Sequence, residues 1–385
     1  MDPLADVALR EGSPRMESVI DAAAARDASA ARTRRELVLR RGLLLVVATT
    51  LLTGVFAGLA RLGVVFAWGP AYALDHGPLL VLGAFGTVIA LERAVALGRG
   101  WALVAPGIGA AAAVAMLAGA PWAPWAATAS ALALAGLNAA IVRRQAAAFT
   151  WLMLLGSAAL FLGDVAWALG RPLFQVVTAW LAFFVLTIVA ERLELSRLAP
   201  TPRWARVALV VLASLLALLA CALGFAPAPR ALGVAMALVA AWQLRFDLAR
   251  RMLRRHGLPR FAAIGVLLGA AWLLVAGVLL VLNGLPPAGP LYDAALHCVF
   301  VGYVLSMVFA HAPIILPAVA RIDVPFSRVL YVPLAVLHLS LAARVAGDLF
   351  AEALLRRVGG IASAVALALF AAALIYARIA RRIAD

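Results

Sequence analysis

The chain has 385 residues, of which 66% are hydrophobic and only 13% are charged. A soluble domain of this length could not bury so much apolar surface, so the composition excludes a soluble enzyme and predicts an all-α, multi-pass membrane protein. The net charge of +15 would suit a nucleic-acid-binding protein. The arginines that carry it are instead distributed as topology signals, and we expect no nucleic-acid partner.

Residues 1–41 are predicted to form an Arg-rich cytoplasmic tail. They mix Arg, Asp, Glu and Ala and lack an apolar core, so they are not a cleaved signal peptide. A loose tail and a short amphipathic helix against anionic lipid are the two alternatives. Residues 42–385 are then a single transmembrane domain, because no internal linker is long enough to divide them.

Twelve segments within residues 42–385 are apolar and long enough to cross a bilayer. Each is predicted to be a transmembrane helix, and most connecting loops are short. The segments are 42–66, 77–98, 101–120, 122–142, 147–169, 173–193, 205–225, 229–248, 261–283, 293–317, 329–350 and 358–379.

The arginines predict the orientation of these twelve helices. If the N-terminus is cytoplasmic, 27 arginines lie on the inner side and 6 on the outer side. Such a bias is what the positive-inside rule requires, and one missed helix would scramble it. Both termini are therefore expected in the cytoplasm, with the protein in the lipid of a bacterial inner membrane.

Two of the five histidines stand where apolar spans begin. His76 opens the second span, and His297 lies about one turn into the tenth. Both spans run from outside to inside, so both imidazoles lie within roughly 3–8 Å of the outer interface. A buried imidazole without a partner is costly, and haem iron prefers axial nitrogen ligands. The pair predicts one haem held between His76 and His297; alternatively, each is an interfacial residue bonded to backbone or to Asp75.

Arg61 and Arg344 are arginines within the outer halves of spans. A charge there is expensive unless it reaches the headgroups or meets an anion. Haem propionates would supply that anion, so both arginines are candidate cofactor-binding residues. Snorkelling to lipid headgroups is the alternative, and Asp348 is close enough in sequence to pair with Arg344.

His311 and His338 form a second candidate pair in the inner half of the membrane. On a regular helix His311 shares a face with His297, about 21 Å deeper. The pair could hold a second haem or a copper ion, gate a proton or substrate path, or make hydrogen bonds between helices. Asp164 likewise suits either proton transfer or a helix contact.

A short pattern recurs at two inner helix ends, as Ile89-Ala90-Leu91-Glu92-Arg93 and Ile188-Val189-Ala190-Glu191-Arg192. Its acidic and basic residues are expected to form interfacial ion pairs rather than catalytic carboxylates. The recurrence would also fit an internal repeat, although it extends over only five residues.

Two segments resemble haem-copper oxidase subunit I. The segment His76-Gly77-Pro78-Leu79-Leu80-Val81-Leu82-Gly83 resembles the oxidase helix whose histidine ligates the low-spin haem from the outer side. The segment Gly302-Tyr303-Val304-Leu305-Ser306-Met307 is similar to the helix that follows the oxidase's His-x-His. The resemblance implies an oxidase-like bundle of twelve helices with the N-terminus inside.

The differences from the oxidases are as informative. Phe300 and Gly302 stand where the oxidases carry histidines, and the sixth and seventh spans contain no histidine. The three-imidazole copper site is therefore missing, and we expect no oxygen reductase.

The chain looks more like the NnrS-type membrane haem proteins, which are associated with nitric oxide and nitrosative stress. That resemblance implies a haem b protein with an electron-transfer, sensing or accessory role and a quinone or cytochrome as redox partner. Whether the protein is an enzyme stays open. The rival hypotheses are a cofactor-free transporter lined by His311, His338 and Asp164, and an assembly partner of a respiratory complex.

Overall fold

Helices make up all the regular secondary structure of the computed structural model, which describes residues 13–64 and 69–384. The α-helices are α1 (Ser13–Arg61), α2 (Gly69–Tyr72), α3 (His76–Pro78), α4 (Thr87–Leu97), α5 (Val104–Leu117), α6 (Ala123–Arg144), α7 (Ala148–Ala168), α8 (Leu173–Leu195), α9 (Arg203–Ala220), α10 (Ala228–Phe246), α11 (Ala249–Met252), α12 (Leu258–Asn283), α13 (Pro290–His297), α14 (Ser306–Ala320), α15 (Tyr331–Leu349) and α16 (Ala353–Ala384). Short 3-10 helices are η1 (Ala73–Asp75), η3 (Gly100–Leu103), η4 (Ser196–Leu198) and η6 (Arg328–Leu330), and π-helices are η2 (Leu79–Gly86) and η5 (Cys298–Leu305).

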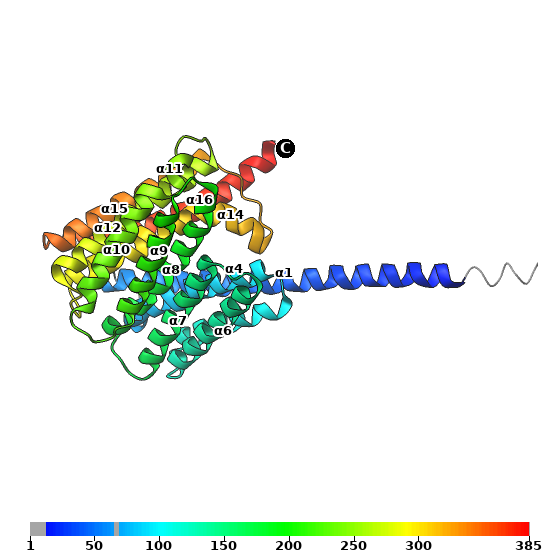
Figure 1. The fold of residues 1–385 in the computed structure, drawn as a ribbon, viewed down its shortest axis with the longest axis horizontal. Helices are drawn as coiled ribbons and strands as arrows, with labels where there is room; N and C mark the ends of the chain where they lie inside the picture. The colour runs from blue at the N-terminus through cyan, green and yellow to red at the C-terminus, as the bar shows by residue number, and fades with distance from the viewer. Residues whose placement is uncertain (1–12, 65–68, 385) are drawn as a thin grey trace, which may run out of the picture.

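The first helix projects from the bundle. Figure 1 shows the N-terminal part of α1 extending away from the other helices. α1 is unbroken over 49 residues, so the predicted boundary between residues 41 and 42 falls inside a helix. Its many Ala and Arg residues favour helix, which explains why the described part of the predicted tail is helical and not loose. Residues 1–12 of that tail lie outside the described residues.

Eleven helices in the described residues are long and apolar enough to cross a membrane. The prediction of an all-helical, multi-pass membrane protein is therefore confirmed. Each predicted span except the eighth overlaps one of these eleven. The eighth corresponds to α10, a 19-residue helix whose apolar run is diluted by Arg230, Gln243 and Arg245.

The core is built around α8, which is more buried than any other span in the described residues. Its buried side chains include the large aromatics Trp180, Phe183 and Phe184. Apolar side chains cover all sides of α8, as expected of a helix surrounded by other helices. In contrast, α1 and α16 are among the least buried spans, so they lie at the edge of the bundle with much of their surface toward lipid.

Two long helices change from α-helix to π-helix within three residues after a histidine. The π-helix η2 follows His76-Gly77-Pro78, and the π-helix η5 begins immediately after His297. A π-helix has a wider turn than an α-helix, so each residue rotates by less than the regular 100°. The prediction that His297 and His311 share one face assumed a regular helix between them, and that assumption is wrong over Cys298–Leu305.

α10 and α12 pack at backbone contact through two glycines. A Cβ at residue 233 would lie 2.6 Å from the carbonyl oxygen of Gly277, and one at residue 277 would lie 2.7 Å from that of Gly233. Small residues are what allow such close packing between helices in lipid. The contact holds α10 against α12 although α10 is not among the eleven helices that are long and apolar enough to cross a membrane.

We expect Gly277→Val to separate α10 from α12 and lower stability, because no flexible side chain can yield to the added carbons. The expected cost is about 1–3 kcal/mol, as for other overpacked cores. Thermal unfolding of the purified protein in detergent measures it. Gly136→Val is the matched control, since a Cβ there meets no atom within 4 Å. Equal unfolding temperatures for the two variants would contradict the packing argument.

Candidate functional site

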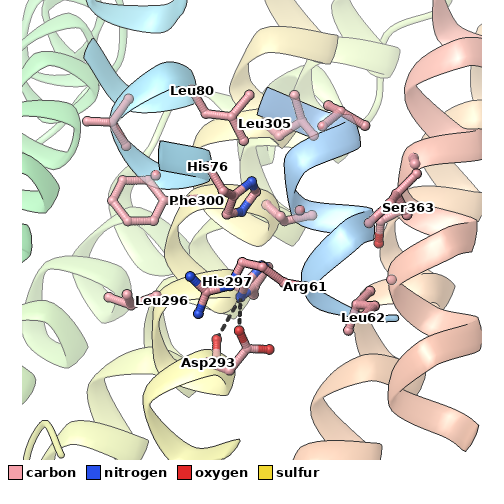
Figure 2. Close-up of a pocket in the computed structure, with 18 of the residues that line it drawn as sticks. Arg61, Leu62, His76, Leu80, Asp293, Leu296, His297, Phe300, Leu305 and Ser363 are labelled. Atoms are coloured by element: carbon pink, nitrogen blue, oxygen red, sulfur yellow. Dashed lines mark hydrogen bonds and ion pairs between the residues drawn. The ribbon is translucent and has the colours of Figure 1, made fainter. Parts of the chain in front are cut away.

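A cavity of about 270 Å³ lies where the C-terminal end of α1 meets α3, α13 and α16. Most of its wall is aliphatic and aromatic, and its polar groups are few and charged or ionisable. Figure 2 shows the residues that line it. The polar and aromatic lining residues include Arg61, His76, Phe85, Trp180, Tyr292, Asp293, His297, Phe300 and Arg344.

The structure brings His76 and His297 together in this cavity. Their ring centroids are 6.4 Å apart and the ring planes differ by only 11°. The two residues are 221 positions apart in sequence. His76 is the first residue of α3, and His297 is the last residue of α13. Figure 2 shows both imidazoles projecting into the same space.

Each imidazole is oriented by a backbone carbonyl. Nδ1 of His76 lies 2.8 Å from the oxygen of Gly54, and Nδ1 of His297 lies 2.8 Å from the oxygen of Asp293. A carbonyl only accepts hydrogen bonds, so in both rings Nδ1 carries the hydrogen and Nε2 carries the lone pair. Metal-binding histidines in proteins show the same arrangement, with the second ring nitrogen donating to a carbonyl or carboxylate.

Two glycines of α1 make room for this arrangement. A Cβ at residue 58 would lie 2.7 Å from Cε1 and 2.8 Å from Nδ1 of His76, and one at residue 54 would lie 2.8 Å from Leu80. Gly54 and Gly58 therefore let α1 approach closely enough for the Gly54 carbonyl to accept from His76. Sequence reasoning missed this role, although two glycines four residues apart in an apolar helix are a recognised packing signal.

Arg344 is paired with Asp293, and not with its sequence neighbour Asp348. The carboxylate Oδ2 of Asp293 accepts from Nε of Arg344 at 3.1 Å and from Nη2 at 2.7 Å. Oδ1 of Asp293 is 3.4 Å from Nδ1 of His297. Asp348 instead lies 3.4 Å from Arg356. The expected partner of Arg344 is thus corrected, because tertiary packing supplies a carboxylate 51 residues away.

Arg61 also lines this cavity. It is the last residue of α1, and within the described part of the chain it makes no hydrogen bond or salt bridge to another side chain. With Arg344 it gives this end of the cavity two guanidinium groups against the carboxylate of Asp293. An anionic group entering the cavity would therefore find an unpaired cation.

The other two candidate histidines have separate partners. Trp272 donates its Nε1 hydrogen to Nδ1 of His338 at 2.9 Å, so Nε2 of His338 is the donor to Ser306 at 3.0 Å. His311 is bonded to Arg192 and to the Met307 carbonyl. In the described residues no three or more His, Cys, Asp or Glu side chains gather closely enough to hold a metal ion.

His338 and Asp164 both act as links between helices. His338 joins α15 to α12 and α14. Asp164 of α7 accepts from the indole nitrogen of Trp180 in α8 at 2.8 Å. Of the alternatives that the sequence leaves for these two residues, hydrogen bonding between helices is the one that these contacts favour. Trp180 also lines the cavity, so Asp164 orients part of its wall.

Comparison with known proteins places the chain in one family. No curated protein and no solved structure matches it. A family model described as "Domain of unknown function (DUF8744)" matches residues 40–379. This stretch covers the transmembrane helices and both histidines of the cavity. The chain therefore belongs to the DUF8744 family.

Proposed function

We propose that this chain is a membrane haem b protein that binds one haem between His76 and His297 and transfers electrons through it. The observation that carries the proposal is the pair of near-parallel imidazoles, each with Nδ1 bonded to a carbonyl and Nε2 left as a ligand. Resemblance to the NnrS-type and oxidase-like haem proteins supports the same proposal from the sequence.

The separation of the rings suits one metal ion between them. An imidazole nitrogen binds a transition metal at about 2 Å and lies about 1.1 Å from its ring centre, so two axial imidazoles place their centroids about 6 Å apart. The centroids of His76 and His297 are 6.4 Å apart. The separation of the two rings is therefore close to the one that a shared metal ion would need.

The surroundings also suit a haem. The cavity volume of about 270 Å³ is slightly below the roughly 300–1,000 Å³ that is usual for cofactor sites. Its apolar wall would cover a porphyrin, and Arg61 and Arg344 are the groups that would pair with its propionates. The cavity lies between α1 and α16, at the edge of the bundle, so a lipid-soluble partner such as a quinone would reach it from the bilayer.

A haem held by His76 and His297 would supply a one-electron couple. The protein residues then have distinct tasks. Arg344 holds the carboxylate of Asp293, and the Asp293 carbonyl holds the ring of His297. The Gly54 carbonyl does the same for His76. The apolar wall excludes water, which favours electron transfer over chemistry on a bound substrate.

The topology completes the proposal. We propose that α10 is a twelfth span and that both termini face the cytoplasm of a bacterium, because this assignment places 27 of the 33 arginines on the inner side. His76 and His297 then lie near the outer face. A sensing or accessory role in nitrosative stress rests on the family resemblance alone.

Either His76→Ala or His297→Ala should remove the α-band of the dithionite-reduced protein, or weaken haem binding at least tenfold. The reason is that one axial nitrogen is lost while the fold keeps its other contacts. His256→Ala, in the loop before α12, is the control. Absorption spectra of protein purified from cells supplied with haem precursor provide the measurement. A normal α-band in both site variants would rule out the assignment.

Gly58→Leu should also reduce bound haem, because the new side chain would occupy the position of the His76 ring. The same helix offers a control in Gly42→Leu, where a Cβ meets no atom within 4 Å. Haem content per protein, measured by pyridine haemochrome, should fall only in the first variant. Equal haem content would show that His76 does not need its place against α1.

Arg344→Leu should lower the haem midpoint potential by tens of millivolts, on the order of 1 kcal/mol. Removing the guanidinium takes a positive charge from the site and leaves the Asp293 carboxylate uncompensated, and both changes favour the oxidised haem. The double variant Arg344→Leu/Asp293→Asn should recover much of the shift. Redox titration measures all three proteins, and an unchanged potential in the single variant would separate Arg344 from the haem.

A further inference from the structure

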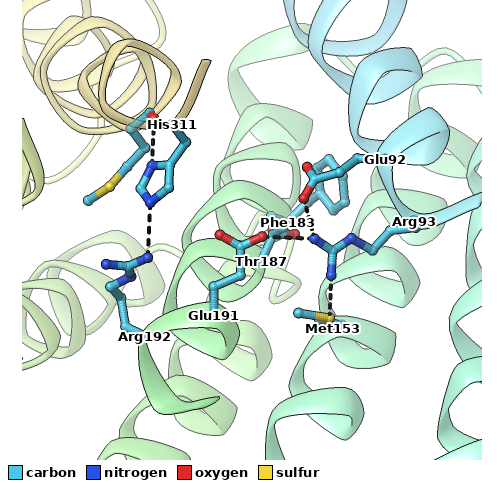
Figure 3. A network of polar contacts seen from close by, with 9 residues as sticks. Glu92, Arg93, Met153, Phe183, Thr187, Glu191, Arg192 and His311 are labelled. Atoms are coloured by element: carbon cyan, nitrogen blue, oxygen red, sulfur yellow. Dashed lines mark hydrogen bonds and ion pairs between the residues drawn. The ribbon is translucent and has the colours of Figure 1, made fainter. Parts of the chain in front are cut away.

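A second group of charges, most of them partly buried, lies where α4, α8 and α14 come together, away from the histidine cavity (Figure 3). Nη2 of Arg93 donates to Glu92 at 2.6 Å and to Glu191 at 2.9 Å. The two copies of the Ile-x-x-Glu-Arg pattern thus meet around one arginine. Because Arg93 takes both carboxylates, the second arginine of the pattern, Arg192, has neither of them as a hydrogen-bond partner.

Arg192 is bonded to a neutral histidine instead. Its Nη2 is 3.0 Å from Nε2 of His311, and Nδ1 of His311 is 2.8 Å from the oxygen of Met307. A guanidinium only donates and a carbonyl only accepts, so Nε2 of His311 is a bare acceptor and Nδ1 carries the hydrogen. His311 is therefore held in its neutral form by Arg192.

An unused carboxylate oxygen lies within electrostatic range of Arg192. Asp247, at the end of α10, is 4% exposed and Arg192 is 6% exposed. Oδ1 of Asp247 accepts from the Ala249 amide at 2.8 Å, but Oδ2 of Asp247 and Nε of Arg192 are both buried without a hydrogen bond among the described residues. The positive charge of Arg192 acts on the carboxylate of Asp247. Opposite charges this deeply buried ordinarily pair.

We propose that His311 is a proton-binding site and that Arg192 moves from His311 to Asp247 when the proton binds. Hydronium at the side we assign to the cytoplasm gives up the proton, which bonds to the lone pair of Nε2 while the O–H bond breaks and water is left. The hydrogen bond from Arg192 to Nε2 is lost in the same step. The imidazolium repels the guanidinium, and Oδ2 of Asp247 offers Arg192 the carboxylate that arginine prefers.

The charges around His311 are compatible with Arg192 at either His311 or Asp247. Glu92 acts on His311 from α4, and beyond it lie Arg93 and Glu191, which are already paired. Arg41 of α1 is bonded to the Ala320 carbonyl at the end of α14. The imidazolium would therefore be stabilised by Glu92, and the released Arg192 by Asp247. Asp247 directly precedes the Arg-rich segment 248–257. The movement of Arg192 would therefore change the charge next to that segment when His311 binds a proton.

The chain has only five histidines, so nitrogen NMR of histidine-labelled protein in lipid can follow His311. His311→Gln assigns its signals; if that variant does not insert, substituting the other four assigns them by elimination. Because burial and the charge of Arg192 both oppose protonation of His311, we expect it to change from the neutral Nδ1–H form to imidazolium only as the pH falls from about 6 to about 3. A His311 that stays neutral throughout would overturn the proposal.

The movement of Arg192 has its own test. In Asp247→Asn, protonation of His311 should need at least a tenfold higher proton concentration, because Arg192 has lost its second partner. Asp323→Asn removes an equal charge from an exposed position after α14 and should leave the titration unchanged. A carbon–nitrogen distance measurement should show Arg192 in contact with Asp247 at low pH only. Identical titrations in the two variants, or an Arg192 that stays in place, would overturn the transfer. Neither readout depends on a group bound between His76 and His297.

Discussion

The hydrogen bonds from His76 and His297 to backbone carbonyls determine which ring nitrogen of each histidine carries the hydrogen. In an apolar environment each imidazole must place its one hydrogen on a partner. Both rings use Nδ1 for this, so both keep Nε2 for another ligand. The Gly54 carbonyl can serve only because α1 lies against the ring of His76, and Gly58 permits that approach. A packing feature of one helix thus sets the chemistry of a residue on another.

The change to π-helix after each histidine also affects how the two imidazoles are oriented. η2 begins three residues after His76, and η5 begins directly after His297. Extra residues within a helical turn re-aim side chains without ending the helix, and such stretches are frequent at functional sites. Here they let two long helices present an imidazole to the cavity while the following turns continue to pack against α1 and α12.

Charges inside the bundle are arranged in two separate groups. In one, Asp293 joins Arg344 to the turn that holds His297. In the other, Arg93 holds Glu92 and Glu191, and Arg192 is left to His311. Buried charge is tolerated in a membrane when it is paired in this way. The bond from Arg192 to a neutral ring is the exception among these contacts.

Much of the architecture could be predicted because its signals are local. Runs of apolar residues mark the spans, and eleven of the twelve predicted spans overlap a described helix that is long and apolar enough to cross a membrane. The positions of His76 and His297 at the start of apolar segments indicate a shared depth, and the structure brings the two rings together. The one span that differs, α10, carries Arg230 and Arg245 near its ends, which lowers its hydropathy without preventing its packing on α12.

The sequence by itself determined the helical class, the membrane location and the two histidines of the cavity, because hydropathy and helix position depend on neighbouring residues only. The tertiary structure alone decided the partners of the polar side chains. Arg344 finds Asp293 and not Asp348, His338 is satisfied by Trp272, and His311 meets Arg192. Those partners lie 51, 66 and 119 residues away, and no spacing rule along one helix predicts contacts that arise where separate helices pack.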